Sequence, residues 1–163
     1  MIVSVIGSEE AGADSLRLAE AVGRELGQRG ITVACGGGGG IMEAACRGAR
    51  SSGGHTIGIL PGHNAGETPP NAWVEFPIFT GLGAARNSIV VLAADAVIAI
   101  NGAYGTLSEI AFALIHKKPI VGIHTWEFSY AEHEADHILR AEDAPDAVEK
   151  VVQLVEALPP AGR

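Results

Sequence analysis

The sequence predicts a single α/β domain over residues 1–163, folded as a Rossmann-like, doubly wound parallel sheet with helices on both faces. Short, continuously apolar segments alternate along the chain with longer amphipathic ones, which is typical of a parallel sheet covered on both faces. The length of 163 residues fits one domain, and 47% apolar against 18% charged residues favours a folded core. The 22 glycines cluster at a few junctions, which indicates sites built from backbone.

Apolar segments that stop at glycine, proline or a polar residue mark the strands. We expect strands at Ile2–Ile6, Ile31–Cys35, Thr56–Leu60, Trp73–Thr80, Ala96–Ile100, Pro119–Ile123 and Ile138–Ala141. Pro77 lacks a backbone N–H, so the segment that contains it is expected to be an edge strand or the end of a strand.

Helices are expected between these strands, over residues 14–29, 41–50, 81–94, 105–116 and 143–158. Asp14 or Ser15 is the expected cap of the first helix, and Asp143 opens the last one with Pro145 just inside. The third helix is apolar over more than one face at Ile89–Leu92, which predicts a homodimer or a higher homo-oligomer.

The net charge and the hydropathy of the chain disfavour some classes of binding partner. A formal net charge of −8 disfavours nucleic acid and anionic membranes, although local N–H groups can still hold a small anion. No apolar run approaches the ~20 residues that a membrane span needs. The segment Met1–Ile6 lacks the basic start of a signal peptide and is expected to be a strand, so we expect a cytoplasmic protein. Cys35 and Cys46 lack metal-ligand spacing, so we expect buried free thiols and no metal site.

Two matched glycine-rich turns are the strongest functional signal. Gly36–Gly40 and Asn101–Gly105 each follow an apolar strand and open a helix. Glycine in such a turn permits positive φ and lets the backbone approach a ligand, and the free N–H groups of the next helix attract an anion. Both turns lie at carboxyl ends of strands, where open α/β sheets bind ligands. The predicted phosphate-binding residues are Gly37, Gly38, Gly39, Gly40, Gly102, Tyr104, Gly105 and Thr106. The structural alternative is tight packing of strand against helix.

Two well-known nucleotide fingerprints are absent. The third glycine of a dinucleotide motif would fall at Ile41 or Met42, and the five-glycine run follows the second strand instead of the first. No G-x-x-x-x-G-K-[ST] occurs either. The sequence therefore disfavours a classical NAD-binding or P-loop protein.

The second turn carries a family resemblance. Asn101–Glu109 resembles the P-G-G-x-G-T-x-x-E motif of the Lonely Guy phosphoribohydrolases, long labelled lysine decarboxylases, in the SLOG superfamily. Arg86 is similar to their active-site arginine, and it precedes Glu109 by the 23 positions that this family shows. Asp95–Ala99 resembles the family's S-D-A-x-I-A strand entry. The resemblance covers roughly Ile2–Ile123 and implies homodimers.

Departures from that motif shift the resemblance within the superfamily. Asn101 replaces proline, Ala103 replaces the second glycine and Asn87 replaces lysine. With Gly36–Ala45 and Gly81–Asn87, these residues make the chain most similar to the molybdenum cofactor carrier protein branch, which implies the molybdenum cofactor (molybdopterin) as a carried ligand. The DNA-processing protein A relatives share the nucleotide fold, but the charge of −8 speaks against a DNA role.

Two functions follow and stay open. In the first, the glycine turns hold the phosphate of a nucleotide-like or pterin ligand for carriage, with Thr106 adding a hydroxyl and Arg86 a bidentate cationic contact. In the second, the protein cleaves the N-glycosidic bond of a nucleoside 5′-monophosphate. Glu109 would then stabilise an oxocarbenium-like transition state or activate water, and Arg86 would position phosphate or ribose. In the structural alternative, Arg86 and Glu109 simply pair with each other.

One further motif points elsewhere. His133–His137 matches the H-E-x-x-H pattern of zinc proteases, which needs one continuous helix to bring both imidazoles to one face. Here the second histidine directly precedes an expected strand, and no third histidine follows. The sequence therefore disfavours a zinc site.

Overall fold

Seven strands form one parallel sheet in the computed structural model, which describes residues 1–129 and 138–159. The strands are β1 (Ile2–Gly7), β2 (Thr32–Cys35), β3 (Thr56–Leu60), β4 (Phe76–Phe79), β5 (Ala96–Ile100), β6 (Ile120–Ile123) and β7 (Leu139–Arg140). Their order is β4-β3-β2-β1-β5-β6-β7, and every neighbouring pair is parallel. The predicted doubly wound α/β fold is confirmed, and the strand with Pro77 does lie at an edge.

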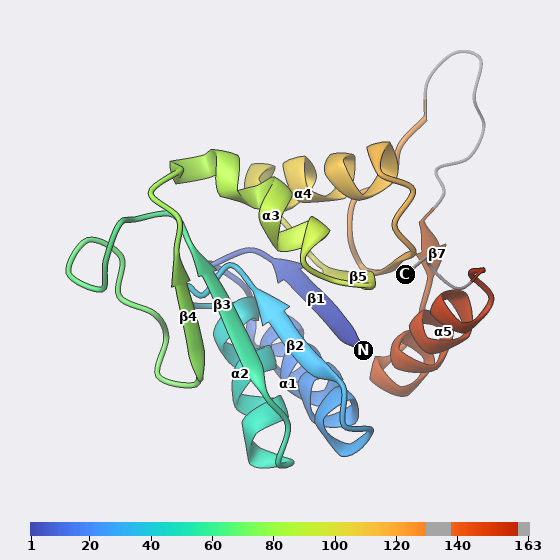
Figure 1. The fold of residues 1–163 in the computed structure, drawn as a ribbon. Coiled ribbons are helices and arrows are strands. Elements are labelled where there is room, and N and C mark those ends of the chain that lie inside the picture. Colours follow the sequence, from blue (N-terminus) through green and yellow to red (C-terminus); the bar gives the residue numbers. More distant parts are fainter. Residues whose placement is uncertain (130–137, 160–163) are drawn as a thin grey trace.

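Helices cover both faces of this sheet (Figure 1). They are α1 (Ala13–Gln28), α2 (Ile41–Ser51), α3 (Asn87–Leu92), α4 (Tyr104–Ile115) and α5 (Ala144–Glu156). One core packs α1, α2 and α5 against the sheet, and a second core packs α3 and α4 against the other face. Residues of β5 alternate between the two, because successive side chains of a strand point to opposite faces: Ile98 and Ile100 join the first core, Val97 and Ala99 the second.

Most expected boundaries hold within a residue or two, and the last helix is capped as expected: Asp143 accepts a hydrogen bond from the Asp146 backbone N–H. Two expectations were wrong. The first helix begins at Ala13, so Gly12 is its N-cap and Asp14 lies inside it. The helix expected from residue 81 starts only with the 3₁₀ helix η1 (Gly83–Arg86), which α3 follows. Gly81 has a φ of +65°, and this value lies outside the region of the right-handed helix.

Strand order creates a crevice at one place. The chain leaves β1 through α1 on one face of the sheet, and it leaves the adjacent β5 through α4 on the opposite face. The two connections therefore diverge at the carboxyl ends of β1 and β5. Open α/β sheets bind their ligands at such a switch point.

Candidate functional site

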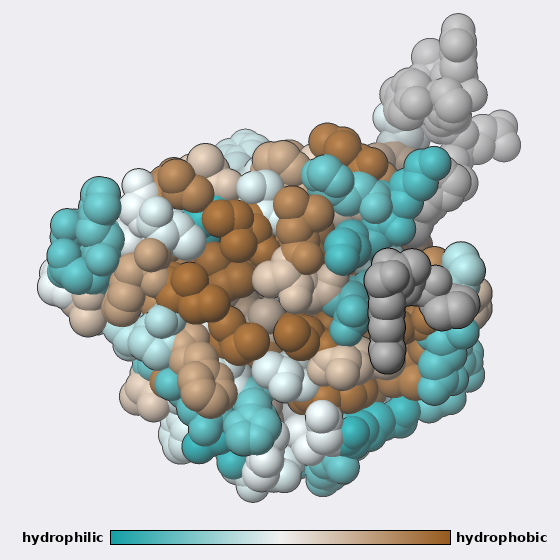
Figure 2. Space-filling view, viewed as in Figure 1, coloured by the Kyte–Doolittle hydropathy of each residue, from teal (hydrophilic) through white to brown (hydrophobic). Residues whose placement is uncertain are grey.

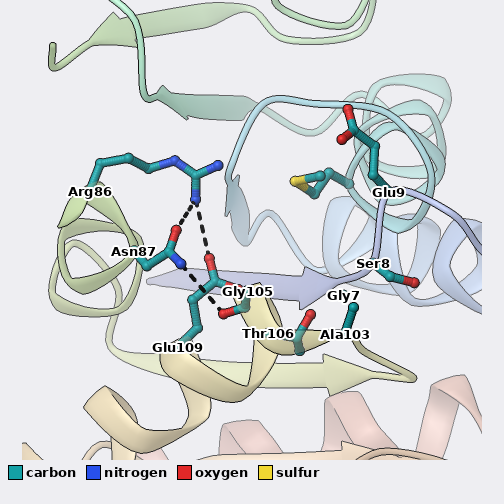
Figure 3. A pocket seen from close by; sticks show the side chains of 10 residues that line it. Gly7, Ser8, Glu9, Arg86, Asn87, Ala103, Gly105, Thr106 and Glu109 are labelled. Carbon is teal, nitrogen blue, oxygen red and sulfur yellow. Dashed lines mark hydrogen bonds and ion pairs between the residues drawn. The ribbon is translucent and has the colours of Figure 1, made fainter. Parts of the chain in front are cut away.

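A cavity of about 250 Å³ occupies this switch point (Figure 3). Three segments line it: the end of β1, the junction of η1 with α3, and the start of α4, together with one side chain of α2. The lining residues are Gly7, Ser8, Glu9, Met42, Arg86, Asn87, Ala103, Gly105, Thr106 and Glu109. Glu9, Ala103 and Gly105 are exposed, so the cavity opens to solvent on their side.

Arg86 provides the positive charge of the cavity. Its Nη1 lies 3.4 Å from Glu109 Oε1 and donates to Asn87 Oδ1 at 2.5 Å, while its Nη2 lies 3.4 Å from the Gly36 carbonyl oxygen. Its buried Nε has no hydrogen-bond partner among the described residues. The guanidinium is thus held in place from three elements and still has an unused donor.

Glu109 lies one turn into α4 and is only 6% exposed. Burial raises the pKa of this carboxyl to about 7, and the nearby Arg86 guanidinium only partly offsets the rise. The group therefore changes charge near neutral pH, as a general acid or base requires. Arg86 and Glu109, predicted together from the family resemblance, do meet in one cavity.

Asn87 connects the Arg86 side chain to α4. Besides accepting from Arg86, it donates through Nδ2 to Ser108 Oγ at 2.7 Å. The α3 helix, which begins at Asn87, is fixed to the sheet, because the Ser4 hydroxyl donates to the Val90 carbonyl at 2.6 Å. Asn87 is therefore a positioning residue for Arg86. The sequence showed it only as a departure from the family motif.

The start of α4 offers backbone N–H groups to the cavity. Ala103 at the N-cap has no side-chain oxygen to satisfy them, and Gly105 and Thr106 of the first turn line the cavity. Tyr104 points elsewhere: it is 81% exposed, and its ring centroid lies 6.2 Å from that of Trp126. The structure thus brings Gly105 and Thr106, but not Tyr104, to Arg86 and Glu109.

The backbone of the two glycine turns is only partly as expected. Gly37, Gly40 and Gly102 have φ of +78°, +61° and +135°. Gly105 does not share this geometry, because it already belongs to α4, and the expectation of positive φ there was wrong. A Cβ on Gly105 would meet nothing within 4 Å, and Gly105 is one of the residues that line the cavity.

In the sheet, β1 lies between β2 and β5. Ser8 and Glu9, which follow β1, therefore lie between the five-glycine turn and the cavity. Among the described residues that line the cavity, none comes from Gly37–Gly40. A Cβ on Gly40 would lie 2.1 Å from the Glu9 carbonyl oxygen, so glycine is needed there for packing. The Ile41 N–H already donates to the Ser8 carbonyl at 3.1 Å. Ser8 and Glu9 were not among the predicted site residues, although they too directly follow an apolar strand.

Other expectations concern metals and membranes. Cys35 and Cys46 are buried free thiols, with their sulfurs 3.4 Å apart. Within residues 1–129 and 138–159, no cluster of three or more potential metal ligands occurs, and no helix is long and apolar enough to span a membrane. The H-E-x-x-H segment at 133–137 lies outside the described residues.

Comparison with known sequences places these features in a family context. The SLOG cluster4 family matches residues 1–155. An uncharacterized protein of Archaeoglobus fulgidus is 39% identical over 76% of this chain and 80% of its own length. A cytokinin riboside 5′-monophosphate phosphoribohydrolase of Oryza sativa subsp. japonica is 31% identical, over 85% of this chain. The match spans 65% of that rice enzyme.

Solved structures with the same fold cover nearly the whole chain. The molybdenum cofactor carrier protein of Chlamydomonas reinhardtii superposes with a TM-score of 0.85 at 34% identity, over 96% of this chain and 98% of that one. The molybdenum cofactor binding protein of Rippkaea orientalis gives a TM-score of 0.83 at 32% identity, over 94% and 96% of the two chains.

Proposed function

This chain belongs to the SLOG cluster4 family, and from that premise we propose that it binds a small phosphorylated, nucleotide-like ligand in the cavity between β1 and β5. One observation carries the proposal: Arg86, the Thr106 hydroxyl and the free N–H groups of α4 all face the same space. A phosphate there would accept charge-assisted hydrogen bonds and lie at the positive end of a 12-residue helix.

Carriage is the form of this function that we favour. The structural neighbours that match this chain over nearly its full length are a carrier and a binding protein of the molybdenum cofactor. Because the cavity opens past Gly105 and Glu9, a phosphorylated pterin larger than 250 Å³ would extend outward from it. The net charge of −8 supports a small ligand rather than nucleic acid as the partner.

Substitution of Gly105 by valine tests the ligand site. The Val side chain would project into the cavity, where the ligand phosphate is proposed to lie, and should weaken AMP binding by about tenfold or more. Calorimetry on both proteins, with mass spectrometry of any ligand that co-purifies, measures the effect. Gly12→Val is the matched control, because Gly12 also has open space around it but lies outside the cavity lining. Equal affinity of Gly105→Val and wild type for every phosphorylated ligand tried would refute the site.

Hydrolysis of a nucleoside 5′-monophosphate is the second candidate function, because Glu109 is buried beside Arg86 and titrates near neutrality. The phosphoribohydrolase relatives support this alternative. Turnover of AMP to ribose 5-phosphate and adenine distinguishes the two functions. Retention of the ligand without turnover supports carriage.

We also propose that the chain forms a homodimer or a higher homo-oligomer through the apolar surface in Figure 2, which extends over α3, β3 and β4. Phe76 and Ile78 pair in register with Ile57 and Ile59, so all four point to the face that α3 and α4 cover. Phe76 and Ile78 are nevertheless 52% and 48% exposed, and Leu92 on α3 is 47% exposed. Exposure of so many large apolar side chains on one face favours a protein partner.

Replacing Leu92 by glutamate should weaken this self-association by about tenfold or more, because the new carboxylate would be desolvated in the interface. Light scattering over a concentration series measures the shift toward monomer. Leu158→Glu is the control, since Leu158 has nearly the same exposure, 48%, and lies two residues beyond the end of α5. A wild-type protein that is monomeric at high micromolar concentration would rule out this interface.

A further inference from the structure

The five-glycine turn already holds an anionic group of the protein itself. Glu9 Oε1 is 3.5 Å from the Gly39 N–H, which donates to it, and a Cβ on Gly38 would lie 3.1 Å from the same oxygen. The turn leads into α2, whose N-terminal end attracts negative charge. The Glu9 carboxylate therefore lies where a phosphate would bind in a turn of this kind.

Two other N–H groups, one in the turn and one at the start of α2, are also engaged. The Gly37 N–H donates to Cys35 Sγ at 3.3 Å, and the Ile41 N–H donates to the Ser8 carbonyl. A second carboxylate is close by, since a Cβ on Gly39 would lie 4.0 Å from Glu43 Oε2. An incoming phosphate would thus meet three N–H groups that are already used and two negative charges at this turn.

The two sides of the cavity therefore differ in charge. Figure 3 shows Arg86 and Glu9 on opposite sides of it, with Thr106 and Glu109 along the α4 wall. The α4 side offers a guanidinium and free N–H groups, whereas the β1 side offers a carboxylate that can only accept hydrogen bonds. A ligand that fits both sides carries its phosphate at α4 and presents hydroxyl or amino groups toward Glu9.

We propose that Glu9 is a specificity-determining residue that denies the five-glycine turn to a second phosphoryl group and so restricts the cavity to ligands with one phosphate. This inference rests on the proposed ligand site, and it adds which class of phosphorylated ligand that site takes. A nucleoside monophosphate or a pterin with a single phosphate monoester satisfies the rule. A nucleoside diphosphate or a dinucleotide does not.

Glu9→Gln tests the role of the charge while keeping an oxygen to accept from Gly39. Calorimetry in metal-free buffer at one ionic strength compares AMP with ADP as probes. We expect wild type to bind AMP more tightly than ADP by about tenfold or more, and Glu9→Gln to shift that ratio toward ADP by about tenfold. Glu10→Gln is the matched control, because it removes the same charge from the neighbouring exposed residue, which lies outside the cavity lining.

The outcomes separate this inference from the proposed function. An unchanged AMP-to-ADP ratio in Glu9→Gln, with AMP still bound, overturns the role of Glu9 and leaves the ligand site standing. If wild type binds neither nucleotide, the proposed nucleotide site fails, and inorganic pyrophosphate then serves as the probe. A gain of pyrophosphate binding in Glu9→Gln but not in Glu10→Gln supports the role of Glu9, and the absence of that gain overturns it.

Discussion

Replacing Arg86 by alanine is expected to weaken AMP binding at pH 7 by about 100-fold, since charge-assisted hydrogen bonds to a phosphate contribute about 1.5–3 kcal/mol each. The guanidinium is the cationic side chain of the cavity lining. Its removal would also raise the pKa of Glu109 further, because Arg86 is the group that lowers it. In the variant, the buried Glu109 carboxyl would be protonated and therefore neutral at pH 7. Because no unpaired charge would then be buried, the variant should fold. Calorimetry with AMP measures the loss of affinity, and circular dichroism checks that the variant is folded.

Two further variants test whether the position and the shape of the Arg86 guanidinium matter, in addition to its charge. Arg24→Ala removes the same charge from a residue that is more than half exposed and lies outside the cavity lining, so it should leave AMP binding unchanged. Arg86→Lys should recover only part of the affinity, because an ammonium cannot make the planar, bidentate contact of a guanidinium. Binding by Arg86→Ala as tight as by wild type would show that the phosphate lies elsewhere.

Local patterns were enough to predict the elements of the fold but not their arrangement. Pro77 restricted β4 to an edge, and Asp143 marked the start of α5, because each acts through the backbone of its own segment. The order of the strands depends on contacts between residues far apart in sequence. The sequence therefore did not reveal that β1 lies between β2 and β5.

That missing strand order explains the difference between the predicted site and the cavity that the structure shows. The two glycine turns look equivalent in sequence, yet β1 ends between them and places Ser8 and Glu9 across Gly37–Gly40. Only the turn before α4 contributes directly to the cavity. The motif spacing did anticipate the meeting of Arg86 and Glu109, because both positions were taken from one family pattern.

Glu109→Gln is expected to stabilise the protein at pH 8 and to slow any hydrolysis that wild type shows by about 1000-fold. The pKa of Glu109 rises from an ordinary value of 4.5 to about 7 on folding, so the folded state binds the proton more tightly than the unfolded state. The stability linked to this group is complete below pH 4.5 and is lost as the pH rises through 7. The full loss is about 3 kcal/mol for a shift of this size. Glutamine resembles the protonated form at every pH and avoids that loss.

Urea unfolding of wild type and Glu109→Gln at pH 5 and pH 8 measures the effect. The two proteins should be similar at pH 5, and the variant should be the more stable at pH 8. Glu156→Gln serves as the control, because that carboxylate is exposed at the end of α5. This variant should not become more stable than wild type at pH 8. Under the hydrolase alternative, AMP turnover should fall about 1000-fold in Glu109→Gln while AMP is still bound. A variant less stable than wild type at pH 8 would mean that the Arg86–Glu109 ion pair stabilises the fold, and the case for Glu109 as a buried acid or base would then be lost.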